Sequence, residues 1–217
     1  FGGYPAFAPC KAAQLLSIPV VLHEQNAIFG RANRRLAAGA KAVALSFAKT
    51  RGLPEGVTAH VVGNPVRPTP DVARPMDAMR RVTIFAGSQG ASFFGPELTK
   101  ALMPLFLEHK DNLEIWHQVR QEVLDEVQKL YLNAGVQARV AVFFKALPQR
   151  LKITDVAIAR AGASTVAELT LFGVASVFVP LPGGLDAQQS INAEALVAQA
   201  GAFMVDQHDF DEQKIVG

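Results

Sequence analysis

A glycine-rich turn near the middle of the chain carries residue types that bind phosphate. The turn reads Phe85-Ala86-Gly87-Ser88-Gln89-Gly90-Ala91 and lies between a predicted strand and a predicted helix. Such a turn lets backbone N–H groups approach a phosphate, and the dipole of the following helix favours the negative charge there. An ordinary tight turn of an α/β fold is the alternative. No Gly-Lys-Ser/Thr sequence follows, so the turn is not a P-loop.

Two further polar stretches follow apolar runs in the second half of the chain. In Arg160-Ala161-Gly162-Ala163-Ser164-Thr165-Val166-Ala167-Glu168, two interpretations stay open for Glu168. Its carboxylate accepts hydrogen bonds from ribose hydroxyls, or it forms a capping box with Thr165, three residues earlier. Gln188 and Gln189 follow another apolar run, where ligands gather in open α/β sheets. Their amides suit sugar hydroxyls, or they are exposed polar residues in the first turn of a helix.

Polar clusters also follow two apolar runs in the first third of the chain, His23-Glu24-Gln25-Asn26 and Gly63-Asn64-Pro65-Val66-Arg67. An arginine at a cleft between two α/β domains pairs with a phosphate, and a solvated surface charge is the alternative for Arg67.

The five histidines show no metal-ligand spacing, so we predict no metal site. No G-x-S-x-G elbow of a hydrolase is present, and Cys10 is interpreted as structural.

The elements that position these residues alternate along the chain. Short apolar runs predict parallel strands buried on both faces, over 18–23, 42–47, 59–62, 81–86, 113–117, 139–144, 156–160, 175–179 and 202–205. Amphipathic stretches predict helices over 8–16, 30–38, 95–108, 121–133, 165–172 and 187–200. Strands that alternate with helices are typical of βαβ units. The predicted class is therefore α/β with doubly wound parallel sheets.

Four prolines from Pro65 to Pro75 predict a linker, because proline interrupts both α-helices and the hydrogen bonding of β-sheets. The linker divides the chain into residues 1–74, interpreted as the rear part of a Rossmann-like domain with its hinge, and residues 75–217, a second Rossmann-like domain. The first part has too few predicted strands for a stable parallel domain, and Phe1 is neither an initiator Met nor part of a signal peptide. We therefore expect a chain cut from a longer protein.

Composition excludes several classes of protein. The 217 residues are 50% hydrophobic and 18% charged, which excludes a disordered chain. A single Cys excludes a disulfide scaffold, and no apolar run approaches the ~18 residues of a membrane span. The formal net charge is +2 and the basic residues are scattered, so we expect no nucleic-acid partner.

Taken in order, the motifs resemble the MurG family of bacterial glycosyltransferases, which complete lipid II. The resemblance covers Phe1 to about Asp209 and rests on Gly2-Gly3-Tyr4, His23-Glu24-Gln25-Asn26-Ala27, Gly63-Asn64-Pro65-Val66-Arg67, Gly87-Ser88-Gln89-Gly90-Ala91, His117-Gln118, the stretch from Arg160 to Leu169, and Pro180-Leu181-Pro182. It implies a GT-B fold, two Rossmann-like domains with the first incomplete. It also implies inverting transfer of N-acetylglucosamine from UDP-N-acetylglucosamine to the muramyl sugar of lipid I.

The resemblance also implies roles for residues of this chain. On the donor side, Ser88 with Gln89 and Gly90 binds the diphosphate, Arg67 adds positive charge, and the backbone of Phe144 meets the uracil. The stretch Ala163, Ser164, Thr165, Val166, Ala167 and Glu168 lines the nucleotide-sugar, with Glu168 on the ribose. Gln188, Gln189 and Asn26 face the sugar hydroxyls. Tyr4, His23 and Glu24 lie on the acceptor side. Ala86 and Arg120 depart from the family pattern.

No residue of this chain is assigned as catalytic, because the family's favoured base is a His that would precede Phe1, and the chain alone is expected to be inactive. The resemblance implies no cofactor and no metal. It implies contact with the membrane surface through the preceding part of the protein, at the cytoplasmic face of the bacterial plasma membrane. Alternatives are a GT-B glycolipid glycosyltransferase with another acceptor, an epimerase of the same fold, or a non-catalytic nucleotide-sugar-binding remnant.

Overall fold

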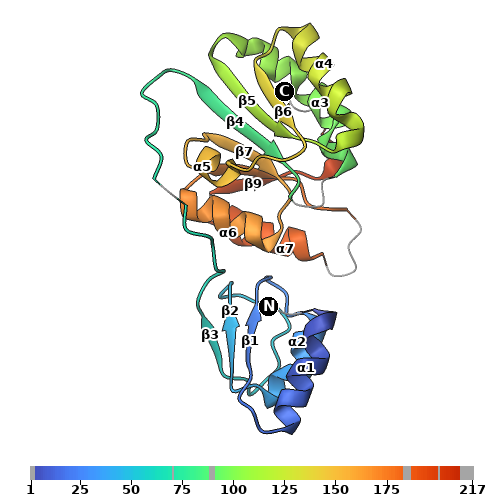
Figure 1. Ribbon diagram of the computed structural model, residues 1–217, viewed down its shortest axis with the longest axis vertical. Helices are drawn as coiled ribbons and strands as arrows, with labels where there is room; N and C mark the ends of the chain where they lie inside the picture. The colour runs from blue at the N-terminus through green and yellow to red at the C-terminus, as the bar shows by residue number, and fades with distance from the viewer. Residues whose placement is uncertain (1–2, 70, 88–90, 183–186, 200, 211–217) are drawn as a thin grey trace.

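The computed structural model describes residues 3–69, 71–87, 91–182, 187–199 and 201–210. Two parallel sheets form its framework (Figure 1). The first has the order β1-β2-β3, with strands β1 (Val21–Glu24), β2 (Ala42–Leu45) and β3 (Ala59–Val61). The second has the order β6-β5-β4-β7-β8-β9. Its strands are β4 (Arg80–Phe85), β5 (Leu113–Gln118), β6 (Ala138–Ala141), β7 (Val156–Ala159), β8 (Ala175–Phe178) and β9 (Ala202–Met204).

Helices complete two lobes. In the N-terminal lobe, α1 (Tyr4–Leu15) and α2 (Arg31–Leu36) lie beside the first sheet. In the C-terminal lobe, α3 (Pro96–Glu108) and α4 (Leu124–Ala134) cover one face of the second sheet. The other face carries α5 (Leu147–Leu151), α6 (Ala163–Phe172) and α7 (Gln188–Val197). Short 3-10 turns cover Ala37–Gly39, Ser92–Phe94, Lys110–Asn112, Gln121–Val123 and Gln207–Asp209. In Figure 1, α6 and α7 lie on the side of the C-terminal lobe that faces the N-terminal lobe.

The central strands of the second sheet, β4 and β7, are buried on both faces over most of their length. Successive side chains of a strand point to opposite faces. Ile84 therefore enters the cluster beneath α3 and α4, while its neighbour Phe85 enters the cluster beneath α6 and α7. Both side chains are at most 2% exposed. This two-sided burial is the physical reason why the sequence shows nearly continuous apolar runs at the central strands, whereas β5 alternates between buried and half-buried positions.

The predicted fold class is confirmed, and each predicted strand has a counterpart in the structure. The helices differ more at their ends. α1 begins at Tyr4, four residues before the predicted start, with Pro5 in its first turn and Pro9 inside it. Proline is accepted in a first turn, where its missing N–H needs no partner. α5 was not predicted, because five residues are too few to show a helical period.

A crevice is expected where the strand order of the second sheet reverses. The chain passes from β4 to β5 and β6 on one side, then returns to place β7 on the other side of β4. Ligands of open α/β sheets bind at the carboxyl ends of strands at such a switch point. Phe85 and Ala159 are register partners, so the ends of β4 and β7 lie side by side where this crevice is expected, and the two glycine-rich stretches of the sequence follow these residues.

The chain between the lobes has no helix or strand among its described residues from 62 to 79. Its second half is attached to the C-terminal lobe. Lys152 Nζ donates to the Thr69 carbonyl over 2.8 Å, and the Asp155 carboxylate pairs with Arg74. The start of this chain segment is attached to the N-terminal lobe instead, because the N–H groups of Val62 and Gly63 both donate to the Leu45 carbonyl. The division at residues 74 and 75 stays a prediction.

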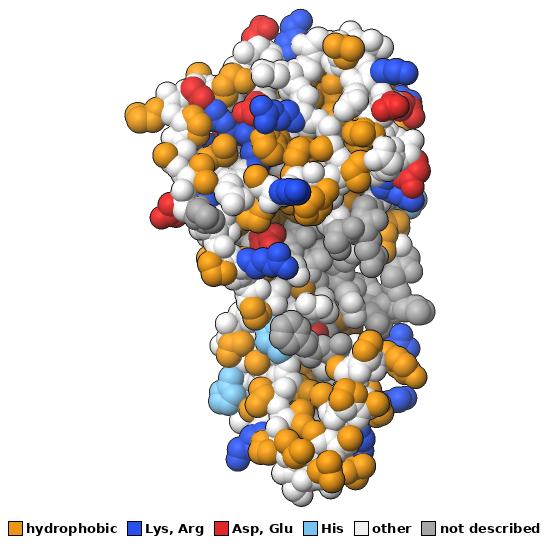
Figure 2. All heavy atoms as spheres, viewed as in Figure 1, with side chains coloured by type: hydrophobic (Ala, Val, Ile, Leu, Met, Phe, Trp, Pro, Cys, Tyr) orange, Lys and Arg blue, Asp and Glu red, His pale blue; other side chains and the backbone are white. Residues whose placement is uncertain are grey.

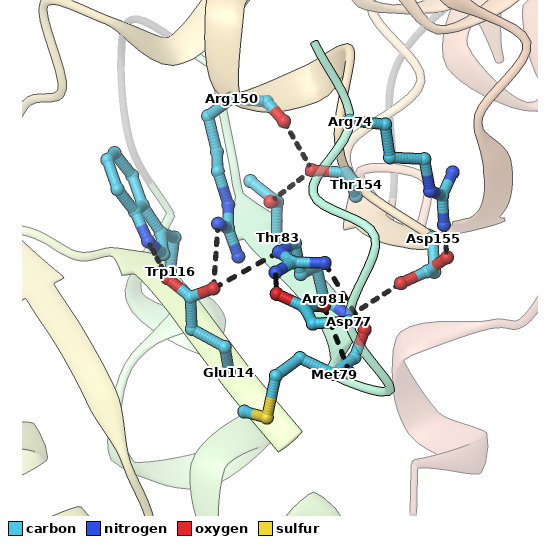
Figure 3. A network of polar contacts seen from close by, with 10 residues as sticks. All are labelled: Arg74, Asp77, Met79, Arg81, Thr83, Glu114, Trp116, Arg150, Thr154 and Asp155. Atoms are coloured by element: carbon cyan, nitrogen blue, oxygen red, sulfur yellow. Dashed lines mark hydrogen bonds and ion pairs between the residues drawn. The ribbon is translucent and has the colours of Figure 1, made fainter. Parts of the chain in front are cut away.

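A network of charged side chains closes the end of the second sheet opposite the switch point (Figure 3). Glu114 Oε2 lies 3.3 Å from Arg81 Nε and 3.1 Å from Arg150 Nη1. Its other oxygen accepts a hydrogen bond of 3.0 Å from Trp116 Nε1. Both arginine side chains are at most 5% exposed. One carboxylate therefore compensates two buried guanidinium groups, and Arg81 has a second partner in Asp77.

Candidate functional site

The turn after β4 begins with the backbone conformation that glycine permits. Gly87 has φ +82°, in the left-handed region that residues with a Cβ atom rarely adopt. Ala86, which departs from the family pattern, is not among the described non-glycine residues with positive φ, so its side chain creates no strain there. The predicted diphosphate residues Ser88, Gln89 and Gly90 lie outside the described residues.

The second turn leads into α6 without a side-chain cap. Gly162 is the N-cap, and Ala163 is already the first helical residue. Thr165 therefore lies inside the helix, and the interpretation of Thr165 and Glu168 as a capping box is wrong, because that motif needs Thr at the N-cap. Ser164 and Val166 belong to the same first turns. The first N–H groups of α6 point toward the switch point, where an anion is stabilised.

Glu168 is a partly buried carboxylate near the chain between the lobes. Among the described residues it forms no hydrogen bond and no ion pair at contact distance. Burial raises the pKa of the Glu168 carboxyl group, and the positive charge of Arg67 acts in the opposite direction. Arg67 itself is exposed. The structure thus brings these two predicted donor residues near each other and leaves the carboxylate oxygens available to a ligand.

Asn192 joins the two lobes, and the sequence analysis missed it. It lies on α7 and is 0% exposed. Its Oδ1 accepts a hydrogen bond of 2.8 Å from the Ala27 N–H. Its Nδ2 donates to Asn26 Oδ1 and to the Ala161 carbonyl, each over 3.2 Å. The predicted sugar residue Asn26 is therefore oriented by a side chain of the other lobe. The sequence does contain a signal for Asn192 as a site residue. Asn192 lies one helical turn after Gln188, so the two side chains are on the same face of the helix.

Other contacts between the lobes surround this bridge. Arg51 Nη2 lies 2.5 Å from Glu194 Oε2, and both side chains are largely exposed. Phe47, from the loop after β2, packs against the apolar cluster beneath α6 and α7. The hydrogen bonds of Asn192 are thus the buried polar part of an interface that also contains an exposed ion pair and an apolar contact.

Glu24 has a structural part in the site. Its side chain is 3% exposed. One oxygen accepts from the Asn26 N–H over 3.0 Å, and the other accepts from the Gly30 N–H and from Asn33 Nδ2 over 2.9 and 2.8 Å. These bonds fix the loop that carries Asn26 and the start of α2. His23 Nε2 donates to the Gly63 carbonyl over 3.0 Å. Both predicted acceptor-side residues therefore also position the backbone around the cavity.

Two cavities lie between the lobes. One, of about 820 Å³, brings together five of the predicted residues: Tyr4, His23, Glu24, Asn26 and Gln188. The other, of about 1140 Å³, is lined by the predicted residues Ala163, Val166 and Ala167 together with segments of the N-terminal lobe. The structure therefore places most of the predicted residues that it describes between the two lobes.

Six of the described predicted residues line neither of these cavities: Arg67, Phe144, Ser164, Thr165, Glu168 and Gln189. Gln189 Oε1 accepts a hydrogen bond of 3.0 Å from the Leu181 N–H. Phe144 lies beyond the end of β6, and its ring packs against Trp116 in a tilted arrangement with centroids 4.8 Å apart. This contact holds the loop after β6 against the sheet, while the backbone of Phe144 stays at the carboxyl end of β6. Arg120, the second departure from the family pattern, is exposed and pairs with Glu122.

Arg160 is a buried cation at the carboxyl end of β7. It is 6% exposed. Its Nη1 donates to the carbonyls of Val179 and Pro180 over 2.9 and 2.7 Å, and its Nη2 donates to Gln207 Oε1 over 2.8 Å. Burial lowers the pKa of the guanidinium. These bonds connect the ends of β7 and β8 and add a positive charge beneath the switch point. Within the described part of the chain, no group of three or more His, Cys, Asp or Glu side chains could hold a metal ion.

His117 is a buried structural residue of β5. It is 0% exposed. Its Nε2 donates to the Phe94 carbonyl over 2.9 Å, and its Nδ1 lies 3.0 Å from the Tyr131 hydroxyl. Because a carbonyl only accepts, Nε2 carries the proton and Nδ1 accepts from the tyrosine. Burial lowers the pKa of His117 to about 4, although the bond to Phe94 opposes the shift.

Acidification is therefore expected to destabilise the fold. Between pH 6.5 and 4 the unfolded chain binds a proton at His117 that the folded chain does not, so the free energy of unfolding falls as the pH is lowered. A shift from 6.5 to about 4 corresponds to roughly 3 kcal/mol. Urea denaturation at pH 7 and pH 4 measures this loss. His117→Gln should reduce the pH dependence of the free energy of unfolding. The control His208→Gln, at an exposed position, should leave this pH dependence unchanged. An equal slope in the His117→Gln protein would contradict the assignment.

Comparisons with known proteins decide the family. The model of the glycosyltransferase family 28 C-terminal domain matches residues 81–217, and that of the family 28 N-terminal domain matches residues 1–45. The chain belongs to glycosyltransferase family 28. Its curated relatives include proteins of Methylorubrum extorquens and Brucella canis, each 41% identical over 99% of this chain. Both carry the name UDP-N-acetylglucosamine--N-acetylmuramyl-(pentapeptide) pyrophosphoryl-undecaprenol N-acetylglucosamine transferase.

Solved structures agree with this family 28 assignment. MurG of Acinetobacter baumannii superposes on the whole chain with a TM-score of 0.82 and 34% identity, and the match covers 62% of the MurG chain. The spinosyn rhamnosyltransferase SpnG in complex with thymidine diphosphate has a TM-score of 0.60 at 18% identity and shares the fold. The predicted GT-B class is therefore confirmed. The chain spans 61% and 59% of the lengths of the two curated relatives.

Proposed function

We propose that this family 28 chain binds UDP-N-acetylglucosamine between its lobes and serves the transfer of N-acetylglucosamine to the muramyl sugar of lipid I. The observation that supports the donor most directly is the arrangement at the switch point. There the amino end of α6 lies at the carboxyl end of β7, and Glu168, whose carboxylate has no partner among the described residues, lies close enough to Arg67 for their charges to interact. The names of the curated relatives support the same reaction.

The charges of the site suit a nucleoside diphosphate. A leaving diphosphate develops negative charge as the sugar departs, and fixed positive groups that face this charge stabilise the transition state. The N–H groups at the start of α6 and the guanidinium of Arg67 supply such groups. Arg160 adds a buried charge below them. The carboxylate of Glu168 suits ribose hydroxyls, because it accepts hydrogen bonds and has no partner among the described residues.

The sugar end of the donor belongs in the 820 Å³ cavity. Asn26 and Gln188 face this cavity from opposite lobes, and their amides offer both donors and acceptors to sugar hydroxyls. The acceptor then enters along Tyr4 and His23. An acceptor carried on a lipid places the protein at a membrane surface, which we propose is the cytoplasmic face of the plasma membrane. In the described residues, no helix is long and apolar enough to cross a bilayer.

Titration with UDP tests the donor site. We expect Glu168→Ala to weaken the binding of UDP by about 1–3 kcal/mol, because the ribose loses its hydrogen bonds to a charged acceptor. Isothermal titration calorimetry measures the affinity, and Glu126→Ala is the matched control. Glu126 is an exposed glutamate on α4 whose contact with Lys100 spans 3.6 Å. Unchanged affinity in the Glu168→Ala protein would remove the ribose assignment, and absence of UDP binding by the unaltered chain would refute the proposed donor.

A further inference from the structure

One wall of the 820 Å³ cavity is basic and has no part in the donor site. Arg31 and Arg35 of α2 both line the cavity, and both are exposed. They are four residues apart, so their side chains are neighbours on one face of the helix. Among the described residues neither forms an ion pair or a hydrogen bond. In Figure 2, basic side chains stand among hydrophobic ones along the edge of the N-terminal lobe where Figure 1 shows α1 and α2.

The carboxylate that lines the same cavity does not neutralise this pair. Glu24 is the acidic residue of the lining, and its two oxygens accept hydrogen bonds from Asn26, Gly30 and Asn33. It is buried behind those groups. Among the described residues of its lining, the cavity therefore presents two guanidinium groups to solvent without a matching negative charge. Such an arrangement attracts an anion.

We propose that Arg31 and Arg35 bind the diphosphate group of the acceptor, an inference that rests on the proposed function. Each guanidinium offers a planar pair of N–H donors that matches two phosphate oxygens, and two adjacent guanidinium groups match two linked phosphates. The other residues that line the cavity suit an acceptor that carries a diphosphate group. Gln188 and Asn26 lie at the sugar side, and the aromatic rings of Tyr4 and Phe7 from α1 complete the wall. The acceptor sugar then meets the donor sugar while its diphosphate contacts α2.

Inorganic pyrophosphate is the probe for this site, added to the chain after saturation with UDP so that the donor phosphate site is filled. We expect Arg31→Gln and Arg35→Gln each to weaken pyrophosphate binding by about tenfold, since each removes charge-assisted hydrogen bonds. The affinity of the unaltered chain should fall as salt is raised. The affinity for UDP should be the same in all variants. Calorimetry provides both affinities, and thermal unfolding confirms that the exposed substitutions leave the fold intact.

Arg34→Gln is the matched control. It removes the same charge from the same helix, but Arg34 Nη2 donates to the Phe29 carbonyl over 3.4 Å and does not line the cavity. Pyrophosphate affinity within about twofold of the unaltered chain is expected. An equal loss in the Arg34→Gln protein would show a general effect of charge and overturn the proposal, as would no loss in the other two variants. UDP binding with no pyrophosphate effect refutes this inference alone, whereas absence of UDP binding refutes the proposed function.

A second probe distinguishes the two anions of the acceptor. An N-acetylmuramoyl peptide carries carboxylates and no diphosphate. We expect Arg31→Gln and Arg35→Gln to leave the affinity of the UDP-saturated chain for this peptide unchanged. A loss of peptide binding in these variants, with Arg34→Gln unaffected, would assign the pair to the carboxylates and overturn the diphosphate assignment.

Discussion

The Glu114→Ala protein is expected to lose about 3–5 kcal/mol of its free energy of unfolding, the cost of removing one partner from a buried ion pair. Glu114 contacts both Arg81 and Arg150, so the substitution leaves two buried positive charges beside each other (Figure 3). Arg81 keeps its contact of 2.5 Å with Asp77. Arg150 keeps no ion pair of comparable strength. Its Nε and Nη2 already lack hydrogen-bond partners in the described structure. Urea denaturation followed by circular dichroism measures the loss.

The matched control is Glu122→Ala. Glu122 also pairs with an arginine, Arg120, over 3.3 Å, but the two side chains are 66% and 48% exposed. Solvent screens such a pair, and its removal is expected to cost less than about 1 kcal/mol. Similar losses in the two variants would show that burial of Arg81 and Arg150 does not set the energy of the network. UDP affinity of the folded Glu114→Ala protein should not change, because the network lies at the opposite end of the sheet from the switch point.

The parts of this fold that the sequence predicts are those set by local pattern. Burial on both faces makes β7 a continuous apolar run and β4 nearly so, and these central strands are therefore visible in the sequence without their neighbours. The left-handed C-caps Gly135 and Gly173 end α4 and α6 where the sequence indicates helix stops. The glycine-rich turns follow strands directly, and a doubly wound topology then brings their ends to one crevice. The order of the strands in the second sheet and the place of the switch point thus agree with the predicted doubly wound topology.

The parts that could not be predicted depend on contacts between distant residues. Asn192 and its partner Ala27 are separated by 165 positions, and the place of Asn192 on the same helix face as Gln188 does not identify a partner in the other lobe. Glu24 looks like a ligand-contacting carboxylate in sequence, yet its oxygens are used by the loop that it shapes. The capping box failed because α6 begins at Ala163, two residues before the predicted start, which moves Thr165 into the helix. Tertiary contacts decide the roles of Asn192 and Glu24, and the position of the helix start decides the role of Thr165.

Replacement of Asn192 is expected to weaken the contact between the lobes and the recognition of the sugar together. Asn192→Ala leaves the Ala27 N–H and the Ala161 carbonyl without partners in a buried position. Each buried polar group without a partner costs about 1–3 kcal/mol, so a loss of roughly 2–6 kcal/mol in the free energy of unfolding is expected. Gln128→Ala is the control, since its exposed amide donates to Val140 over 3.4 Å within the C-terminal lobe.

Ligand affinities separate a positioning role of Asn192 from a purely structural one. UDP is proposed to contact α6 and Arg67, and its affinity should be kept in the Asn192→Ala protein. The N-acetylglucosamine group depends on Asn26, which loses its hydrogen bond from Asn192 Nδ2. The affinity for UDP-N-acetylglucosamine should therefore fall by about tenfold relative to UDP.

Asn192→Asp keeps an acceptor for the Ala27 N–H but faces Asn26 Oδ1 and the Ala161 carbonyl with a second acceptor, and we expect it to show the same split between the two ligands. Parallel losses of both affinities would mean that Asn192 only stabilises the fold. A protein that binds both ligands as before would show that Asn26 is oriented without it, and the sugar would then have to be held from one lobe alone.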